Sequence, residues 1–260
     1  MPRFAANLSL MFTEVPFLER FGAAAAAGFS AVEFQFPYAY SVEDIVKEVN
    51  AHHLQVVLFN APPGDFAKAG ERGIAALPGR ERAFEQSFAQ ALIYARALHC
   101  PRIHVMAGLI HQGATREVFV RNLKNATILA ALEKITVLVE PINTRDIPGY
   151  LINRTTEALA VMTLVAEANI KLQLDLYHRQ LMEGDLTGAV DEFAAVAGHV
   201  QIAQPPDRGE PDHGEINFQH VLATLDATGY LGWVGCEYKP RRETSAGLGW
   251  LDAYPQGPGR

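Results

Sequence analysis

Several features that would place a chain outside the ordinary metabolic enzymes are missing from this sequence. Only two cysteines occur among its 260 residues, Cys100 and Cys236, and both lie in apolar stretches far apart in the chain. A disulfide scaffold is therefore excluded, and two reduced thiols in a core are expected. No apolar run reaches about 18 residues, and the first residues contain no apolar stretch followed by a small-residue cleavage site, so neither a membrane span nor a signal peptide is expected. These absences favour a cytoplasmic protein.

Positive charge is also scarce. The 22 Lys and Arg residues are scattered and outnumbered by 29 Asp and Glu, which gives a formal net charge of −7. Nucleic-acid phosphates are bound by basic surfaces, so no nucleic-acid partner is expected. No linker or low-complexity stretch divides the chain, and one α/β barrel commonly takes about 250 residues. We therefore expect a single domain over residues 1–260, with the Pro- and Gly-rich end, about 255–260, as a loose tail.

Short apolar runs alternate with longer helical patterns from one end of the chain to the other. The runs are apolar on both faces, as expected of parallel strands covered by helices. The helical segments have readable ends: Ser41 is a cap with Asp44 three residues later, and Gly28, Gly198 and Gly229 fall where helices would stop. Repeated strand–helix alternation predicts a (β/α)8 TIM barrel. The eight expected strands are residues 3–9, 31–36, 55–61, 102–108, 136–142, 171–175, 199–203 and 233–238.

Polar residues interrupt seven of these apolar strands, mostly near their carboxyl ends. In an α/β barrel the carboxyl ends of the strands form the functional face. Glu140, Asp175 and Glu237 end the fifth, sixth and eighth strands and would bring three negative charges to one mouth. Buried carboxylates that converge repel one another strongly unless something positive meets them. The other strands contribute Glu33, Asn60, His104 and Gln201.

Two structural explanations compete with a functional one for these carboxylates. In the first, each carboxylate pairs with a different Arg or Lys; in the second, the strands are rotated and the carboxylates point outward. In the functional explanation, Glu140, Asp175, Glu237 and the amide oxygen of Gln201 hold a hard divalent cation. Oxygen-only ligands favour Mg²⁺ or Mn²⁺ over Zn²⁺, which prefers His or Cys. We favour the metal site.

Long motifs along the chain also carry a family resemblance. They are FAANLSLMFTEVPFLERF, AVEFQFPY, LPGRE, HVMAG, DLYH, HVQIAQPPDRGEPDHGEINF and GCEYKPRRETSAGLGWLDA. With them the sequence resembles the hydroxypyruvate isomerase family of xylose-isomerase-like barrels, which includes 2-oxo-tetronate isomerases. The resemblance implies metal ligands at Glu140, Asp175, Gln201 and Glu237, with Glu140 and Glu237 also as proton donor and acceptor. Sugar epimerases of the superfamily usually have His where this chain has Gln201.

The resemblance implies a small hydroxy-oxo acid as substrate and an aldose–ketose type isomerisation. The family reaction moves a carbonyl between adjacent carbons through an enediolate, as from hydroxypyruvate to tartronate semialdehyde, and a divalent cation stabilises the developing charge. Our first expectation is a hydroxypyruvate isomerase. The alternative is an isomerase of the four-carbon 2-oxo-tetronate, because VEPINTRDIPGYLINRTTEA, around Glu140, is at least as similar to those members. Further alternatives are a metal-dependent sugar epimerase and a phosphodiesterase on the same barrel.

An anionic substrate needs cations nearby, since three carboxylates and one divalent ion sum to −1. Arg208 and Lys239 lie on the loops after the last two strands, and the fork of an Arg suits a carboxylate. His178, in the D-x-x-H motif, is expected to touch a substrate oxygen or to orient a ligand. His104 is a further candidate for substrate contact, with a core histidine as the alternative, and Glu33 is expected to support the site. The sequence leaves a homo-oligomer open.

Overall fold

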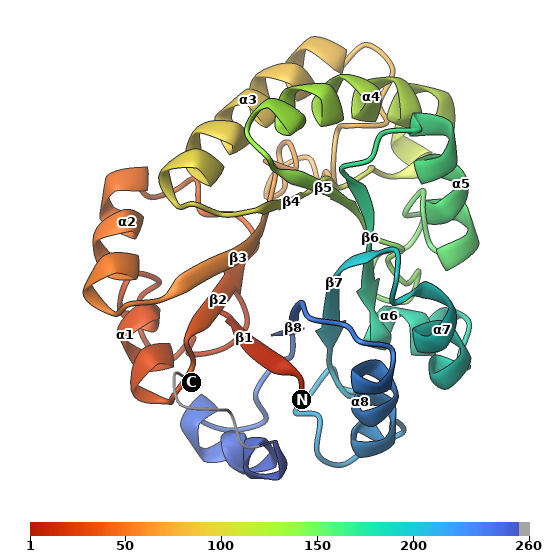
Figure 1. Ribbon diagram of the computed structural model, residues 1–260. Helices are drawn as coiled ribbons and strands as arrows, with labels where there is room; N and C mark the ends of the chain where they lie inside the picture. The colour runs from red at the N-terminus through yellow and green to blue at the C-terminus, as the bar shows by residue number, and fades with distance from the viewer. Residues whose placement is uncertain (255–260) are drawn as a thin grey trace.

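A ring of helices surrounds a closed barrel of parallel strands in the computed structural model of the chain (Figure 1). The structure describes residues 1–254, and within them eight strands pair in sequential order, with β1 closing on β8. The predicted (β/α)8 TIM barrel is confirmed. The loose tail predicted at about 255–260 lies outside the described residues.

Every predicted strand is present, and most end earlier than the apolar pattern does. As a result, Glu140 and Glu237 directly follow their strands instead of ending them. The largest difference is at the fourth strand, where the chain leaves the sheet after His104 and the Ala107 N–H is bound by the Tyr150 hydroxyl at 2.9 Å. The strands are β1 (Arg3–Asn7), β2 (Ala31–Phe34), β3 (Gln55–Asn60), β4 (Arg102–His104), β5 (Thr136–Val139), β6 (Ile170–Asp175), β7 (Ala197–Ile202) and β8 (Trp233–Cys236).

Three of the four predicted helix signals act as expected. Ser41 caps its helix by accepting the Asp44 N–H at 3.1 Å, and its hydroxyl donates to the Asp44 carboxylate at 2.6 Å. Gly28 and Gly229 follow helices with φ of +91° and +79°, where glycine has no steric penalty. The helices are α1 (Glu19–Ala26), α2 (Val42–Ala51), α3 (Glu81–Ala97), α4 (Arg116–Leu132), α5 (Thr155–Val165), α6 (Leu176–Met182), α7 (Leu186–Phe193), α8 (Phe218–Ala227), and the 3₁₀ helices η1 (Ile110–Gln112) and η2 (Thr244–Ala253).

The prediction that Gly198 ends a helix is wrong. Helix α7 ends at Phe193, and Gly198 lies inside β7. A Cβ at this position would come within 2.7 Å of both Leu138 Cδ2 and Lys171 Cβ. Glycine is needed here because β5 and β6 approach the backbone of β7 closely, a use that a helix-end signal does not distinguish.

The interior of the barrel changes from apolar to polar toward the carboxyl ends of its strands. Cys100 and Cys236 are buried and free, as predicted. Glu33, His104 and Gln201 are each at most 2% exposed, although they are polar. Within residues 1–254, none of the helices combines the length and apolar character that crossing a membrane requires. The barrel thus gathers buried polar groups at one end, and these form the candidate site.

Candidate active site

Three buried carboxylates meet at the carboxyl end of the barrel. Glu140 follows β5, Asp175 ends β6 and Glu237 follows β8, and they are 5%, 3% and 6% exposed. One carboxylate oxygen from each and one ring nitrogen of His178 all lie within 4.8 Å of one another. The strand registers therefore turn the three carboxylates inward and together, and the outward orientation considered above does not occur.

Burial makes these carboxylates hard to ionise together. It raises the pKa of Glu140 well above the usual value, and the charges of Glu237 and Asp175 raise that pKa further. Burial also raises the pKa of Asp175 and of Glu237, although the Arg208 guanidinium opposes both shifts. Oε1 of Glu140 and Oδ2 of Asp175 are buried without a hydrogen-bond partner. Unpartnered buried carboxylate oxygens are costly, so the residues present fit a divalent cation.

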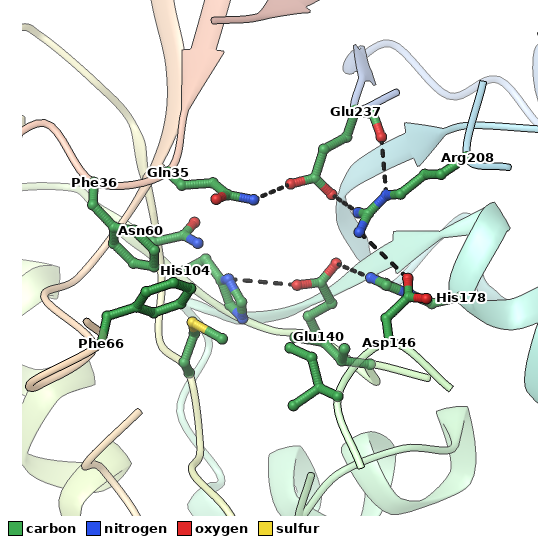
Figure 2. Close-up of a pocket in the computed structure, with 13 residues that line it drawn as sticks. Gln35, Phe36, Asn60, Phe66, His104, Glu140, Asp146, His178, Arg208 and Glu237 are labelled. Carbon is green, nitrogen blue, oxygen red and sulfur yellow. Dashed lines mark hydrogen bonds and ion pairs between the residues drawn. The ribbon is translucent and has the colours of Figure 1, made fainter. Parts of the chain in front are cut away.

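Arg208 is the cation beside this cluster (Figure 2). Its Nη2 lies 2.6 Å from Glu237 Oε2 and 3.6 Å from Asp175 Oδ2, and its Nη1 lies 3.7 Å from Asp146 Oδ2. Its guanidinium carbon is 5.0 Å from the centre of the Tyr177 ring. Burial by itself would lower the pKa of Arg208, but the surrounding carboxylates outweigh it and raise that pKa above its usual value. Arg208 is therefore a permanent positive charge at the mouth of the barrel.

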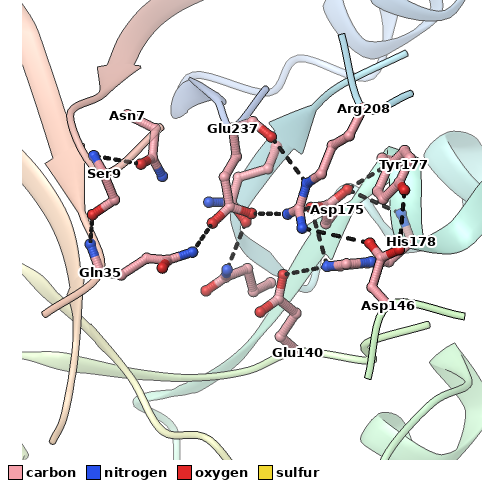
Figure 3. A network of polar contacts seen from close by, with 12 residues as sticks. Asn7, Ser9, Gln35, Glu140, Asp146, Asp175, Tyr177, His178, Arg208 and Glu237 are labelled. Carbon is pink, nitrogen blue, oxygen red and sulfur yellow. Dashed lines mark hydrogen bonds and ion pairs between the residues drawn. The ribbon is translucent and has the colours of Figure 1, made fainter. Parts of the chain in front are cut away.

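Glu237 is held from two sides in a longer polar network (Figure 3). Its Oε1 accepts from Gln35 Nε2 at 2.9 Å, and its Oε2 accepts from Arg208 Nη2 at 2.6 Å. The backbone N–H of Gln35 in turn donates to Ser9 Oγ at 2.8 Å, and the Ser9 N–H donates to Asn7 Oδ1 at 3.0 Å. These bonds fix the direction of the Glu237 carboxylate toward Glu140 and Asp175.

His178 presents an N–H group to the carboxylates. Asn143 Oδ1 accepts the Asp146 N–H at 2.7 Å, which places the amide nitrogen of Asn143 2.6 Å from His178 Nδ1. Nδ1 is then the acceptor and the ring proton is on Nε2, which is 3.8 Å from Glu140 Oε1 and 3.7 Å from Asp175 Oδ2. Burial, aided by Arg208, lowers the pKa of His178 to about 3, so the ring is neutral. In this orientation the Nε2–H of His178 faces the oxygens of Glu140 and Asp175.

Glu33 fixes the amide of Gln201. Its Oε1 accepts from Asn7 Nδ2 at 2.9 Å and from Gln201 Nε2 at 2.7 Å, and its Oε2 is 2.6 Å from His199 Nε2. The amide oxygen of Gln201 therefore turns away from Glu33, and it accepts from Gln173 Nε2 at 2.6 Å. Glu33 is not one of the clustered carboxylates, and it contacts the site through Gln201, as expected of a residue that supports the site.

The other predicted residues differ in how near they lie to the cluster. Gln201 is the register partner of Asp175 across β6 and β7, with its oxygen already bonded to Gln173. His104 lines the pocket, and its Nδ1 is 3.5 Å from Glu140 Oε2; burial, with His178 adding to it, lowers the pKa of His104 to about 3. The structure does not bring the side chain of Lys239 to the pocket. Lys239 is exposed to solvent, and its backbone N–H donates to the Arg208 carbonyl at 2.8 Å.

A pocket of about 470 Å³, measured with its open mouth, lies beside the carboxylates (Figure 2). Sequence reasoning missed most of its wall, because part of it lies in segments that were expected to continue the strands and part lies on loops, where alternation gives no signal. Asp146, in the polar stretch soon after Glu140, is the one that sequence position alone points to. The missed lining residues are Gln35, Phe36, Phe66, Met106, Ile142, Asp146 and Ile147.

Comparison with known proteins assigns the family. Residues 21–254 match the family model described as a xylose isomerase-like TIM barrel. The 2-oxo-tetronate isomerase of Cupriavidus necator is 52% identical over 258 residues, which cover 98% of this chain and 99% of that protein. The hydroxypyruvate isomerase of Escherichia coli is 46% identical over 258 residues, which cover 98% of this chain and 100% of that protein. The chain belongs to the hydroxypyruvate isomerase family. It is therefore an isomerase, and the resemblance found in its motifs is confirmed.

A crystal structure of a Brucella melitensis protein shows the same barrel. It is described as an AP endonuclease of family 2, and it is 51% identical with a TM-score of 0.95 over 98% of this chain and 100% of that one. In the present chain, which belongs to the hydroxypyruvate isomerase family, the buried group of Glu140, Asp175, His178 and Glu237 is consistent with a divalent metal site.

Proposed function

We propose that this chain isomerises 2-oxo-tetronate, a four-carbon 2-oxo acid. The observation that carries the proposal is the 52% identity to the Cupriavidus 2-oxo-tetronate isomerase over nearly all of both chains, against 46% to the Escherichia coli hydroxypyruvate isomerase. Hydroxypyruvate, our first expectation from sequence, becomes the second candidate. The two acids share the reacting carbons and differ by one CHOH unit, so the same catalytic residues serve both.

The proposed cofactor is Mg²⁺ or Mn²⁺. The carboxylates of Glu140, Asp175 and Glu237, with the amide oxygen of Gln201 as the fourth ligand, make an all-oxygen set of the kind that these ions prefer. The unpartnered oxygens of Glu140 and Asp175 support this assignment. A bound ion would act as a Lewis acid on the carbonyl and hydroxyl oxygens of the substrate.

Glu140 and Glu237 are the proposed proton acceptor and donor. One removes a proton from the carbon beside the carbonyl, and the other delivers a proton to the neighbouring carbon. Both carboxylates line the pocket, where the reacting carbons of a substrate can reach them, which supports these roles. Gln35 and Arg208 hold the two oxygens of Glu237, which orients that carboxyl for the transfer.

Arg208 is the proposed partner of the substrate carboxylate, and His178 of a substrate oxygen. Arg208 lines the pocket with its side chain 15% exposed, so an entering anion reaches a guanidinium that is otherwise surrounded by protein. Its planar fork suits the two oxygens of a carboxylate. The Nε2–H of His178 is held toward the pocket by Asn143 and is available to donate.

The proposal is tested by assaying the purified protein with both acids. We expect a higher kcat/KM for 2-oxo-tetronate than for hydroxypyruvate, complete loss of activity in EDTA, and recovery on adding Mg²⁺ or Mn²⁺. A preference for hydroxypyruvate would overturn the substrate assignment, and full activity in EDTA would overturn the metal. An oligonucleotide with an abasic site is a useful control substrate, given the description of the Brucella protein, and we expect no cleavage of it.

A further inference from the structure

One wall of the pocket carries two polar side chains that make no hydrogen bond to any of residues 1–254, although His104 Nδ1 lies 3.5 Å from Glu140 Oε2. Asn60 ends β3 and His104 ends β4, and the two are register partners on neighbouring strands. Both ring nitrogens of His104 are buried without a hydrogen-bond partner, and His104 is 1% exposed. The side-chain amide of Asn60 makes no hydrogen bond to any of residues 1–254, although the residue is only 9% exposed. Buried polar groups are nearly always paired, so the His104 ring indicates a ligand, and the Asn60 amide lies in the same pocket wall, where such a ligand can reach it.

The backbone under this wall is firmly fixed. The Tyr38 hydroxyl donates to the Asn60 carbonyl at 2.7 Å, and the Ala61 N–H donates to the His104 carbonyl at 2.8 Å. Phe36 and Phe66 line the same pocket beside the two polar groups (Figure 2). The amide and the ring are therefore carried by a fixed backbone in a wall that is largely shielded from water, where a hydrogen bond to a ligand is strengthened.

The position of this wall matches one end of a four-carbon substrate. Figure 2 shows Arg208 on one side of the pocket, Asn60 and His104 on the other, and Glu140 and Glu237 between them. In the proposed reaction C1 is the carboxylate, C2 and C3 exchange the carbonyl, and C4 carries a hydroxyl. With C1 at Arg208 and the reacting carbons at the two glutamates, C4 extends toward Asn60 and His104. Hydroxypyruvate has no C4.

We propose that Asn60 and His104 form a subsite for the terminal hydroxyl of a four-carbon substrate and thereby set the chain-length preference. The inference rests on the proposed function. A hydroxyl both donates and accepts, and an Asn amide offers one group of each kind. A three-carbon acid leaves these groups unpaired, and a polar site rejects an analogue that lacks the group it binds.

The test compares the two acids in subsite variants. Asn60→Leu keeps the branched shape of the side chain and removes both hydrogen-bonding groups, and His104→Phe keeps a flat ring and removes its two nitrogens. We expect the ratio of kcat/KM for 2-oxo-tetronate to that for hydroxypyruvate to fall by roughly tenfold in each variant. Asn50→Leu, at an exposed position on α2, is the matched control and should leave the ratio as in the wild type. Thermal unfolding of every variant verifies the fold, and Asn60→Ser replaces any Asn60 variant that does not fold.

The outcomes separate the subsite from other roles. Equal losses on both acids would overturn the proposal and assign His104 to the shared chemistry through its contact with Glu140. An unchanged ratio in both variants would overturn it as well. A wild-type enzyme without activity on the four-carbon acid would overturn the proposed function together with the subsite, and this result is visible before any variant is made.

Discussion

Glu140 is placed where its catalytic use and the stability of the fold conflict. Burial and the charges of Glu237 and Asp175 raise its pKa in the folded protein above the 4.5 of an ordinary Glu. The folded state therefore binds this proton more tightly than the unfolded chain does. The resulting contribution to stability is fully present below pH 4.5 and is lost as the pH rises through the folded pKa. At neutral pH, in the absence of a cation, the carboxylate weakens the fold that holds it.

Glu140→Gln is accordingly expected to raise the Tm of EDTA-treated protein at pH 8 and to lower kcat by a factor of about 10²–10⁴. The gain in Tm should shrink at pH 5, because lowering the pH protonates more of the wild-type carboxyl, whose pKa is raised. Thermal unfolding at the two pH values and a steady-state assay with Mg²⁺ measure both effects. Glu192→Gln, exposed on α7, is the matched control and should change neither quantity. A variant less stable than the wild type at pH 8 would contradict this account.

Some residues of the site could be predicted from the sequence, and others could not, because their orientation depends on distant parts of the chain. Glu140, Asp175 and Glu237 could be predicted because a carboxylate at the end of an apolar strand is conspicuous in the sequence. The donor role of His178 could not, since its tautomer is set by Asn143, 35 residues away, whose amide is itself turned by the Asp146 N–H. The direction of the Lys239 side chain could not be predicted either, because its position two residues after Glu237 does not determine which way that side chain points.

Among the elements, the connection between β3 and α3 (residues 61–80) contributes Phe66 to the wall of the pocket. Glu71 anchors it by accepting from Arg80 Nη1 at 2.5 Å and from the Asp65 N–H at 2.6 Å. This connection packs against the segment that follows β4: the Ala76 N–H donates to the Ala107 carbonyl at 2.9 Å. Gly73 permits this approach: with φ at +112°, a Cβ there would lie 2.2 Å from the Met106 carbonyl oxygen.

Gly73→Ala should therefore push apart two segments that line the pocket through Phe66 and Met106. We expect a severalfold higher KM for the substrate acid and a lower Tm. Gly70→Ala is the informative comparison, because Gly70 also has a positive φ, +65°, but its added Cβ would meet nothing within 4 Å. Both variants carry backbone strain, so equal effects on KM would show that strain and not the contact with Met106 is responsible.

The same contacts explain how far the elements could be predicted. The eight strands could be read from their length and apolar character, which are local properties. The end of β4 could not be predicted. VMAG continues the strand pattern in the sequence, but the Met106 backbone packs closely against Gly73, which is distant in the chain. The helix-end prediction for Gly198 is wrong for a related reason. The side chains that require a glycine at this position, Leu138 and Lys171, lie on other strands and are far away in the sequence.

On the scale of the whole molecule, the two ends of the barrel have different tasks. The proposed catalytic groups occupy the carboxyl end. At the amino end, Arg102 of β4 reaches across to β7 and donates through Nε to the Gly198 carbonyl at 2.6 Å, with a longer contact to the Val57 carbonyl of β3 at 3.4 Å. Arg102 thus links strands that are not neighbours in the sheet.

Arg102→Met is expected to lower the free energy of unfolding by about 1–3 kcal/mol, the range for hydrogen bonds from a charged donor, and to leave kcat/KM within about twofold of the wild type. Urea denaturation measured beside the activity assay separates the two quantities. Arg82→Met, exposed on α3, controls for the loss of a positive charge. A loss of activity that exceeds the loss of stability would show that the amino end is coupled to the site.

The closure of the barrel also governs how the chain can fold as it is made. Strand β1 pairs with β2 on one side and with β8 on the other, where Phe4 faces Val234, and the Phe4 ring meets Trp250 at 5.0 Å. Until residues 233–236 leave the ribosome, one edge of β1 has no partner in its own chain. An open strand edge is a template for pairing with other chains, and contacts between distant parts of a sequence form slowly. Translation that stops before Trp233 therefore yields a sheet prone to aggregation, whereas completing β8 removes that edge.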